Sequence, residues 1–268
     1  MHALVEELLD LLLPPVCAGC GASVAARKAL CEACWRALHP ISPDACLRCQ
    51  ARPARAGERC PGCLTSRDPL DACLAAVWFE GDASHWIHRF KYPKPGLAGL
   101  DAPARAVMSL LAERAAALVA PPDPDLLIPI PLHPHAVRRR GFNPAAVLAG
   151  AMARRRGVPL DPVGLIRTRD TPSQTGLSRV ERRRNLAGAF QPRCRLPARI
   201  WLVDDVVTTG ATLHAAARAC RAAGARQVIA VCAARTPAPE QAQESKASVR
   251  PIAGGKRDLP DDNPGSPP

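Results

Sequence analysis

Eight cysteines arranged as four Cys-x-x-Cys pairs constrain the fold of this 268-residue chain more than any other feature. The pairs are Cys17/Cys20, Cys31/Cys34, Cys46/Cys49 and Cys60/Cys63. Each pair places two thiolates on one tight turn, and two such pairs supply the four corners of a tetrahedral Zn²⁺ site. Ten residues separate the first pair from the second, and ten separate the third from the fourth. This repeat predicts two structural zinc sites of four cysteines each rather than redox-active or incidental cysteines.

Spacing alone does not settle which pairs share an ion. Sequential pairing joins the first pair to the second and the third to the fourth, which closes the shorter loops and is therefore favoured. Cross-pairing between the two halves stays open at this point.

The C-terminal half alternates short apolar runs with helix-forming segments. Asn143-Pro144 is typical of a helix start and Gly157 of a helix end, and Asp101 similarly precedes an Ala/Leu-rich helix. The predicted strands are 126–130, 200–203 and 227–233, and the predicted helices are 144–156 and 212–223. Strand, loop, helix and strand in this order predict an α/β fold with a parallel sheet, whose ligands bind beyond the carboxyl ends of the strands.

A segment with two adjacent aspartates, followed by threonines and a glycine, comes directly after the predicted strand at 200–203. It begins with Asp204 and Asp205 and continues through Val207, Thr208, Thr209, Gly210, Ala211 and Thr212 into a helix. Loop amides, threonine hydroxyls and the helix dipole suit a phosphate dianion, whereas the two carboxylates suit ribose hydroxyls or Mg²⁺. The alternative is a solvated Asp-Asp turn before an ordinary helix. The string is neither a P-loop nor a dinucleotide-binding G-x-G-x-x-G motif.

Positive charge is concentrated in one segment of the chain. Residues 138–199 hold fifteen arginines, no lysine and three acidic residues, which equals the formal net charge of +12 of the whole chain. A solvated helix surface, a pyrophosphate-containing ligand and a polyanion such as single-stranded DNA each fit this pattern. Aromatic residues make up only 3% of the chain, so a nucleic-acid site here would depend on charge more than on base stacking.

The two ends of the chain lie outside the strands and helices predicted for the α/β fold. The first fifteen residues carry three acidic residues and predict a short amphipathic helix, not a signal peptide or a membrane span. Together with the twelve cysteines, this predicts a reduced, cytoplasmic protein. The last 33 residues are rich in Pro, Gly, Ser and acidic residues and predict a disordered tail. The predicted organisation is a zinc module at 1–66, an α/β domain at 67–235 and the tail at 236–268.

The string from Asp204 to Thr212 resembles the phosphoribosyl-pyrophosphate (PRPP) motif of type I phosphoribosyltransferases. With the four Cys-x-x-Cys pairs ahead of it, the chain resembles the ComF family of competence-associated, phosphoribosyltransferase-like proteins over roughly residues 8–235. The further matching strings are Leu12–Cys17, Phe90–Tyr92, Ile130–Pro134, Arg140–Asn143, Thr171–Gln174, Arg182–Asn185 and Gly188–Phe190. The resemblance implies a type I phosphoribosyltransferase-like parallel sheet with flanking helices and a small N-terminal zinc-ribbon module.

The resemblance also implies roles for individual residues. Asp204 and Asp205 would be catalytic residues that bind the ribose 2′- and 3′-hydroxyls, and residues 207–212 would bind the 5′-phosphate. Pro131 and Leu132 would lie in the pyrophosphate loop. The segment 167–185, with Gln174 and the catalytic candidate Arg182, would form a lid, and Arg140 would also contact PRPP. Mg²⁺ bound with PRPP is the implied cofactor beside two structural Zn²⁺ ions.

Three hypotheses of function remain open from the sequence. The chain could be a phosphoribosyltransferase, a single-stranded DNA-binding factor that acts with the DNA-uptake machinery in transformation, or a PRPP-sensing regulator without turnover. The fold does not distinguish them, and the sequence identifies neither the acceptor nor the oligomeric state.

Overall fold

The computed structural model describes residues 15–25, 28–50, 58–66, 68–93, 101–119, 122–168 and 188–237. The predicted N-terminal helix lies outside these residues, and so does nearly all of the predicted tail. Gln174 and Arg182 of the predicted lid also lie outside them.

The predicted strand–helix–strand unit is present. β5 (Arg199–Val207) leads into α9 (Ala211–Ala222), and α9 is followed by β6 (Gln227–Arg235), which pairs with β5 in parallel. Strand β5 is longer than predicted because the β-branched Val206 and Val207 continue its pairing with β6. Asp204 and Asp205 therefore lie inside the last part of the strand instead of following it.

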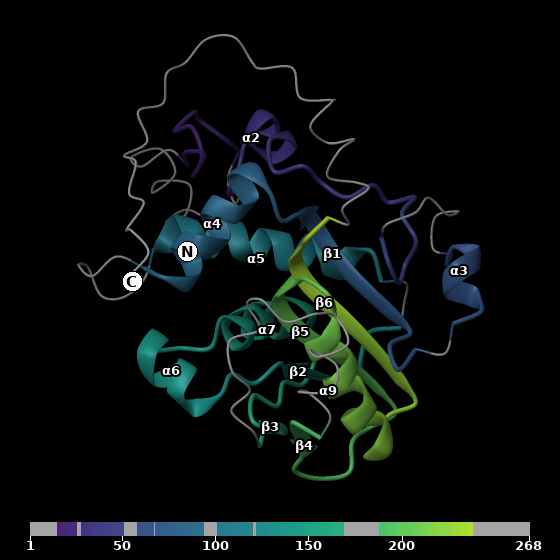
Figure 1. Cartoon of the computed structure of the whole chain (residues 1–268). Helices are drawn as coiled ribbons and strands as arrows, with labels where there is room; N and C mark the ends of the chain where they lie inside the picture. The colour runs from purple at the N-terminus through teal and green to yellow at the C-terminus, as the bar shows by residue number, and fades with distance from the viewer. Residues whose placement is uncertain are drawn as a thin grey trace, which may run out of the picture. The chain divides into compact units, whose positions relative to one another are not determined.

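The sheet has four strands in the order β1-β6-β5-β2, all parallel (Figure 1). β2 (Leu126–Pro129) is the predicted strand at 126–130. β1 (Ala72–Trp78) was not predicted, although six of its seven residues are buried. Because β1 and β2 are the outer strands, the carboxyl end of β5 lies near the middle of the sheet edge.

Helix boundaries follow their capping residues. α7 (Pro144–Arg156) begins after Asn143, whose side chain accepts a hydrogen bond from the Ala145 amide, and ends at Gly157 in the left-handed conformation. α5 (Ala102–Ala117) begins after Asp101, which accepts from the Ala104 amide. Both predicted helix starts are confirmed. Two further helices described in the sheet region are α4 (Gly81–Lys91) and α6 (Pro134–Arg140).

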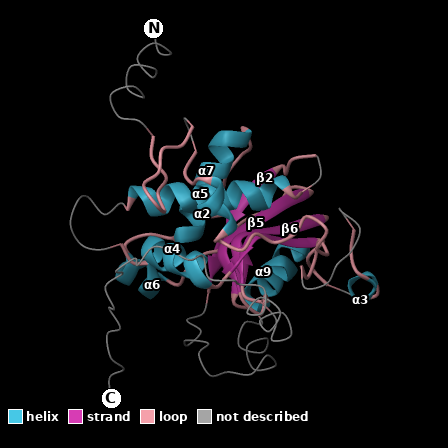
Figure 2. Ribbon diagram, turned by 90° about the horizontal axis from the view of Figure 1, so that it is seen from above, coloured by secondary structure: helices cyan, strands magenta, loops and turns pink. Residues whose placement is uncertain are grey.

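Helices cover both faces of the sheet (Figure 2). α4, α5 and α7 pack on one face, where Leu74, Trp201 and Val231 belong to the first hydrophobic cluster. α9 packs on the other face, where alternate residues such as Leu202 and Ala230 belong to the second cluster. Burial on both faces explains why the strands read as continuous apolar runs.

The cysteine-rich segment, residues 15–66, has two short helices among its described residues and contacts the outer edge of β1. The helices are α2 (Glu32–Arg36) and α3 (Pro61–Leu64). The amide of Ile41 donates to the Ala76 carbonyl, and the Trp78 amide donates to the His39 carbonyl. The Gln50 side chain exchanges two hydrogen bonds with the backbone of Ala75, at 2.8 and 2.9 Å. This segment therefore covers the edge of β1 that faces away from β6.

A small second sheet forms from strands on either side of the predicted lid. β3 (Leu165–Arg167) pairs antiparallel with β4 (Phe190–Pro192), and Arg167 lies opposite Phe190. The first residue of the predicted lid, Arg167, thus lies beside a strand that follows the lid in the chain.

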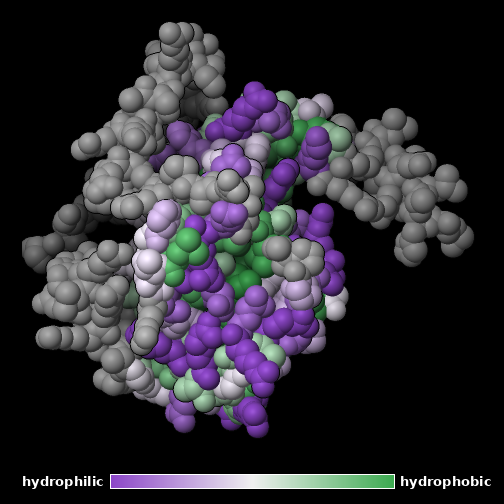
Figure 3. Space-filling view, turned by 90° about the vertical axis from the view of Figure 1, so that its right-hand side faces the viewer, coloured by the Kyte–Doolittle hydropathy of each residue, from purple (hydrophilic) through white to green (hydrophobic). Residues whose placement is uncertain are grey.

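Polar side chains cover most of the face shown in Figure 3, with hydrophobic side chains gathered near its centre. Six large hydrophobic residues are exposed among those described: Val16, Leu64, Tyr92, Val137, Val163 and Ile166. Within the part of the chain that the structure describes, no helix has the length and apolar character needed to cross a membrane.

Candidate functional site

Two clusters of four cysteines form in the N-terminal segment. Cys17, Cys20, Cys31 and Cys34 make the first cluster, and Cys46, Cys49, Cys60 and Cys63 make the second. Within each cluster the sulfur atoms all lie within 4.8 Å of one another. Sequential pairing is therefore confirmed, and four thiolates at this separation fit a tetrahedral Zn²⁺ ion.

Backbone amides point at the sulfur atoms in both clusters. The amides of Gly19 and Cys31 donate to Cys17 Sγ at 3.4 and 3.3 Å. Burial alone would raise the pKa of Cys17, but these amides and that of Cys20 outweigh it and lower the pKa to about 6. In the second cluster the Cys60 amide donates to Cys46 Sγ at 3.2 Å. The donors favour the thiolate form, which is the form that binds zinc.

The two aspartates of β5 lie at the carboxyl end of the sheet. Asp205 is buried, and its Oδ1 lies 3.0 Å from Nζ of Lys91, the last residue of α4. Asp204 is partly buried, and its Oδ1 accepts a hydrogen bond from the Asp205 amide at 2.9 Å. Adjacent residues of a strand point to opposite faces, so the two carboxylates flank the end of β5.

Asp204 has a strongly shifted acidity. Burial raises its pKa from 3.8 to about 7, and the charge of Asp205 adds to the effect, while the Asp205 amide and the charge of Lys91 oppose it. A carboxyl group that changes charge near neutral pH at the end of a strand is typical of a binding or catalytic site.

The loop from β5 to α9 forms the predicted phosphate-binding segment. Gly210 has a φ of +74° and is the N-cap of α9. Thr208 is exposed, Thr209 and Thr212 are partly exposed, and Oγ1 of Thr209 accepts from the Ala211 amide at 3.4 Å. The side chains of Val207 and Ala211 are buried, so these two residues can offer a ligand only their backbone.

Gly210→Ala is expected to destabilise the fold by about 1–2 kcal/mol, because an L-residue is strained at this positive φ. The added Cβ would also lie 2.9 Å from Cε1 of His214. Thermal unfolding measures the effect. Gly150→Ala is the matched control, since its Cβ would meet only Arg154 Nη1 at 3.5 Å, and it should leave stability unchanged or raise it. Equal unfolding temperatures for the two variants would contradict the assigned loop geometry.

The loop after β2 lies beside the end of β5. The Ile130 amide donates to the Val203 carbonyl at 2.8 Å, and Asn143 Nδ2 donates to the Ile130 carbonyl at 2.9 Å. Pro131 and Leu132 follow immediately and are partly exposed. Both predicted pyrophosphate-loop residues therefore leave the sheet at the same edge as Asp204.

Arg140 lies against the end of α4. Its Nη2 donates to the Tyr92 hydroxyl at 3.1 Å, and its guanidinium covers the Tyr92 ring at 5.0 Å. Tyr92 follows Lys91 directly, so Arg140 contacts the residue next to the cation that pairs with Asp205. The structure thus places the predicted Arg140 against the residue after Lys91, whereas Gln174 and Arg182 lie outside the described residues.

Known proteins resemble this chain over most of its length. Residues 8–64 match the double zinc ribbon domain, and residues 136–252 match the phosphoribosyl transferase domain. The chain is 28% identical over 207 residues to Competence protein F of Haemophilus influenzae, covering 76% of this chain and 89% of the relative. It is 31% identical over 227 residues to DNA utilization protein YhgH of Salmonella typhi, covering 82% of this chain and 90% of the relative. The chain belongs to the ComF family.

This ComF-family chain also matches the solved structure of TT1426 from Thermus thermophilus. The match has 23% sequence identity and a TM-score of 0.31, and it covers 54% of this chain and 79% of that chain. A score this low supports no structural argument.

The ComF-family site contains two residues that had no role in the sequence-based predictions. Lys91 contacts Asp205, and it could have been found because it stands in the Phe90–Tyr92 string that the family shares. His214 contacts the Gly210 carbonyl through Nδ1 at 2.6 Å. The sequence signal for this role was its position on the first turn of α9.

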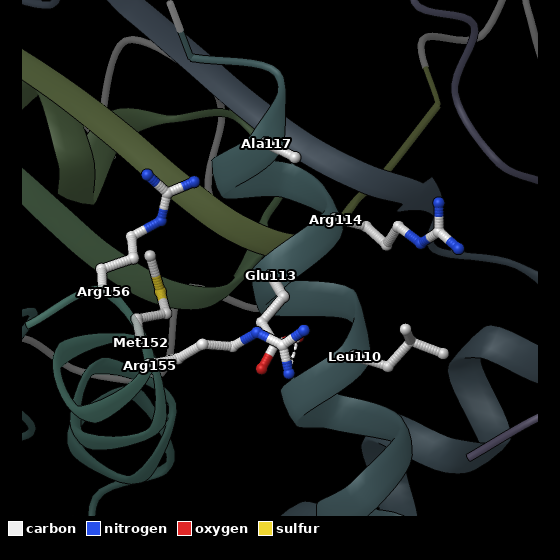
Figure 4. Close-up of a pocket in the computed structure, with 7 residues that line it drawn as sticks. All are labelled: Leu110, Glu113, Arg114, Ala117, Met152, Arg155 and Arg156. Atoms are coloured by element: carbon white, nitrogen blue, oxygen red, sulfur yellow. Dashed lines mark ion pairs between the residues drawn. The ribbon is translucent and has the colours of Figure 1, made fainter. Parts of the chain in front are cut away.

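A cavity of about 490 Å³ lies between α5 and α7, apart from the site at the carboxyl end of β5. Its charged residues are largely paired: Arg155 contacts Glu113 at 3.2 Å (Figure 4). Arg156 contacts Asp123, which lies outside the cavity. Arg199, elsewhere in the basic segment, pairs with Asp125 at 2.6 Å. Acidic residues from outside the segment 138–199 thus neutralise part of the charge that its composition suggests.

Proposed function

We propose that this ComF-family chain binds PRPP with Mg²⁺ at the carboxyl end of β5 and transfers the phosphoribosyl group to an acceptor. The observation that carries the proposal is the Asp204–Asp205 pair, held next to Lys91 and followed by a loop that enters α9 at Gly210. The match of residues 136–252 to the phosphoribosyl transferase domain supports the same interpretation.

Each part of the site has a chemical task in this proposal. The carboxylates of Asp204 and Asp205 accept hydrogen bonds from the ribose hydroxyls. The amides and hydroxyls of Thr208 and Thr209, with the N-terminal dipole of α9, hold the 5′-phosphate. As pyrophosphate leaves C1, positive charge develops on the ribose, and the nearby carboxylates stabilise it without a covalent nucleophile.

Mg²⁺ fits this site together with the substrate. Carboxylate oxygens are hard ligands of the kind that Mg²⁺ prefers, but Lys91 already supplies the positive charge next to Asp205. We therefore assign Mg²⁺ to the pyrophosphate oxygens, where it would neutralise the developing negative charge. Pro131 and Leu132 contribute the loop on that side, and Gln174 and Arg182 are proposed to close over the leaving group.

Isothermal titration with PRPP and Mg²⁺ tests binding directly. Saturable heat from the full-length protein supports the proposal, and its absence at millimolar ligand refutes it. Release of pyrophosphate in the presence of an acceptor extract then separates an enzyme from a PRPP-sensing regulator, which binds but does not turn over.

The affinity for PRPP is expected to rise with pH between 6 and 8. Since the pKa of Asp204 is raised to about 7, only about a tenth of this carboxyl is ionised at pH 6, and affinity should be up to about tenfold weaker there. The raised pKa of Asp204 also affects stability. Between about pH 4 and pH 7 the unfolded chain ionises this carboxyl but the folded protein does not, so the free energy of unfolding should fall over this range and stay constant above it.

Titrations of Asp204→Asn across the same pH range give the comparison. The variant should bind at the low-pH level of the wild type throughout, because an amide cannot ionise. An Asp204→Asn profile as steep as that of the wild type would show that another group, such as a phosphate of PRPP, causes the pH dependence.

A second candidate function is binding of single-stranded DNA. The exposed guanidinium groups of Arg138 and Arg139 on α6 favour it, and relatives carry the names DNA utilization protein and Competence protein F. Binding through phosphates should weaken steeply with salt. Fluorescence anisotropy with a labelled oligonucleotide at about 50 and about 200 mM salt tests this, with Arg138→Gln/Arg139→Gln as the variant; no binding at low salt would refute it.

A further inference from the structure

We propose that the second cysteine cluster and its metal hold the phosphate-binding loop in shape through an Asp68–His214 link. Asp68 follows the second cluster in the chain, and His214 stands on the first turn of α9. The two are positioning residues, and their proposed effect on PRPP binding rests on the function proposed above.

His214 connects the loop to Asp68 through both nitrogens of its ring. Nδ1 lies 2.6 Å from the carbonyl oxygen of Gly210, and Nε2 lies 2.9 Å from Oδ2 of Asp68. Both partners are hydrogen-bond acceptors, so a ring that satisfies both carries two protons and a positive charge. The hydrogen bond to Asp68 raises the pKa of His214 accordingly, against the effect of burial.

The segment shortly before Asp68 is in turn held by the second cluster. Arg48, which stands between the ligands Cys46 and Cys49, donates through Nη1 to the Cys63 carbonyl at 2.7 Å. The same nitrogen donates to the carbonyl and the hydroxyl of Ser66, at 3.0 and 2.7 Å. The backbone that leads from the last metal ligand toward Asp68 is therefore tied to the turn that carries the first two.

The start of the loop is held by the same cluster. Val207 lies opposite Arg235 in the pairing of β5 with β6. Arg235 donates to Gln50 Oε1 at 3.1 Å and to the Arg48 carbonyl at 3.5 Å. The backbone amide of Gln50 donates to the Cys46 carbonyl at 2.9 Å. The loop from Val207 to Thr212 is thus connected to the second zinc ribbon near both of its ends, through Arg235 at its start and through His214 near its end.

The first cluster has a different neighbour. It lies next to α5, where the Arg114 guanidinium covers the ring of Trp35 at 5.0 Å. The two ribbons therefore differ in what they support, and the second one is the ribbon that the proposal concerns.

His214→Asn and Asp68→Asn test the link in the full-length, zinc-loaded protein. Each is expected to weaken binding of ribose 5-phosphate and of PRPP with Mg²⁺ by about tenfold in isothermal titration, since His214→Asn removes the imidazole that joins Gly210 to Asp68 and Asp68→Asn removes the charge that strengthens its hydrogen bond to His214. Binding of Mg²⁺-pyrophosphate, which does not use the loop, should stay within about twofold of the wild type. A merely structural role would weaken both kinds of ligand, and that result would overturn the proposal.

His39→Asn is the matched control. His39 also joins the ribbon segment to the sheet region through a carboxylate, with Nδ1 3.2 Å from Oε1 of Glu80, but it lies away from the loop. It should leave all three affinities unchanged. Cys63→Ser, which removes a ligand of the second cluster, should weaken ribose 5-phosphate binding in the same direction as His214→Asn, whereas Cys194→Ser should not.

Hydrogen exchange distinguishes failure of the link from failure of the proposed function. If the wild type binds no PRPP, the proposed function is refuted, but the loop amides of residues 208–212 still report on the link. They should exchange faster in His214→Asn and Asp68→Asn than in the wild type and His39→Asn. Unchanged exchange in all variants would overturn the link.

Discussion

Replacing Asp204 and Asp205 together by asparagine is expected to lower the affinity for PRPP with Mg²⁺ by about 10²–10⁴-fold. Each carboxylate that accepts a hydrogen bond from a ribose hydroxyl contributes about 1.5–3 kcal/mol, and asparagine keeps the shape but loses the charge. Isothermal titration of the double variant beside the wild type measures the loss. Relief of the like charges at the end of β5 should offset only part of the ion pair that Asp205 loses with Lys91, so thermal unfolding of the double variant checks that it remains folded.

Asp82→Asn is the matched control for this experiment. Asp82 is an exposed residue in the first turn of α4, the helix that also carries Lys91, so the same chemical change is made outside the site. Its affinity should equal that of the wild type. A double variant that binds PRPP as well as Asp82→Asn does would show that β5 does not carry the ligand.

Cys46→Ser is expected to reduce the zinc content from two ions per chain to one and to lower the unfolding temperature by roughly 10 °C or more. Zinc binding contributes about 10–16 kcal/mol to the folding of small zinc-finger peptides, and one of the four sulfur ligands is lost here. Elemental analysis and calorimetry measure the two effects.

Cys194→Ser serves as the control for cysteine replacement. Cys194 is exposed and belongs to neither cluster. This variant should keep two zinc ions and the unfolding temperature of the wild type. Retention of two ions by Cys46→Ser, or no zinc in the wild type, would contradict the assignment of the clusters.

The features that could be predicted from the sequence are those with local causes. The start and end of α7 follow from Asn143, Pro144 and Gly157, whose backbone preferences act without the rest of the fold. The grouping of the cysteines follows from loop length. Prediction was less accurate where pairing between strands decides: β5 runs past Asp204 because its valines find partners on β6.

Long-range contacts explain most of what the sequence did not reveal. β1 is a short apolar run without periodicity, so its place beside β6 depends on the assembled sheet. The ion pair of Lys91 with Asp205 joins residues that lie far apart in the chain. The positive charge of residues 138–199 is likewise smaller in the folded structure than composition suggests. Glu113, Asp123 and Asp125, which lie outside this segment in the chain, form ion pairs with its arginines.

The cover that the cysteine-rich segment provides for β1 has a consequence for the fate of the metal-free protein. β1 carries the apolar sequence Ala-Cys-Leu-Ala-Ala-Val-Trp, and its outer backbone groups bond to Ile41, Gln50 and His39. An uncovered edge of this kind pairs readily with the same edge of another molecule. We therefore expect removal of zinc to cause copies of the chain to aggregate. The two metal ions would then preserve the solubility of the protein as well as its folded structure.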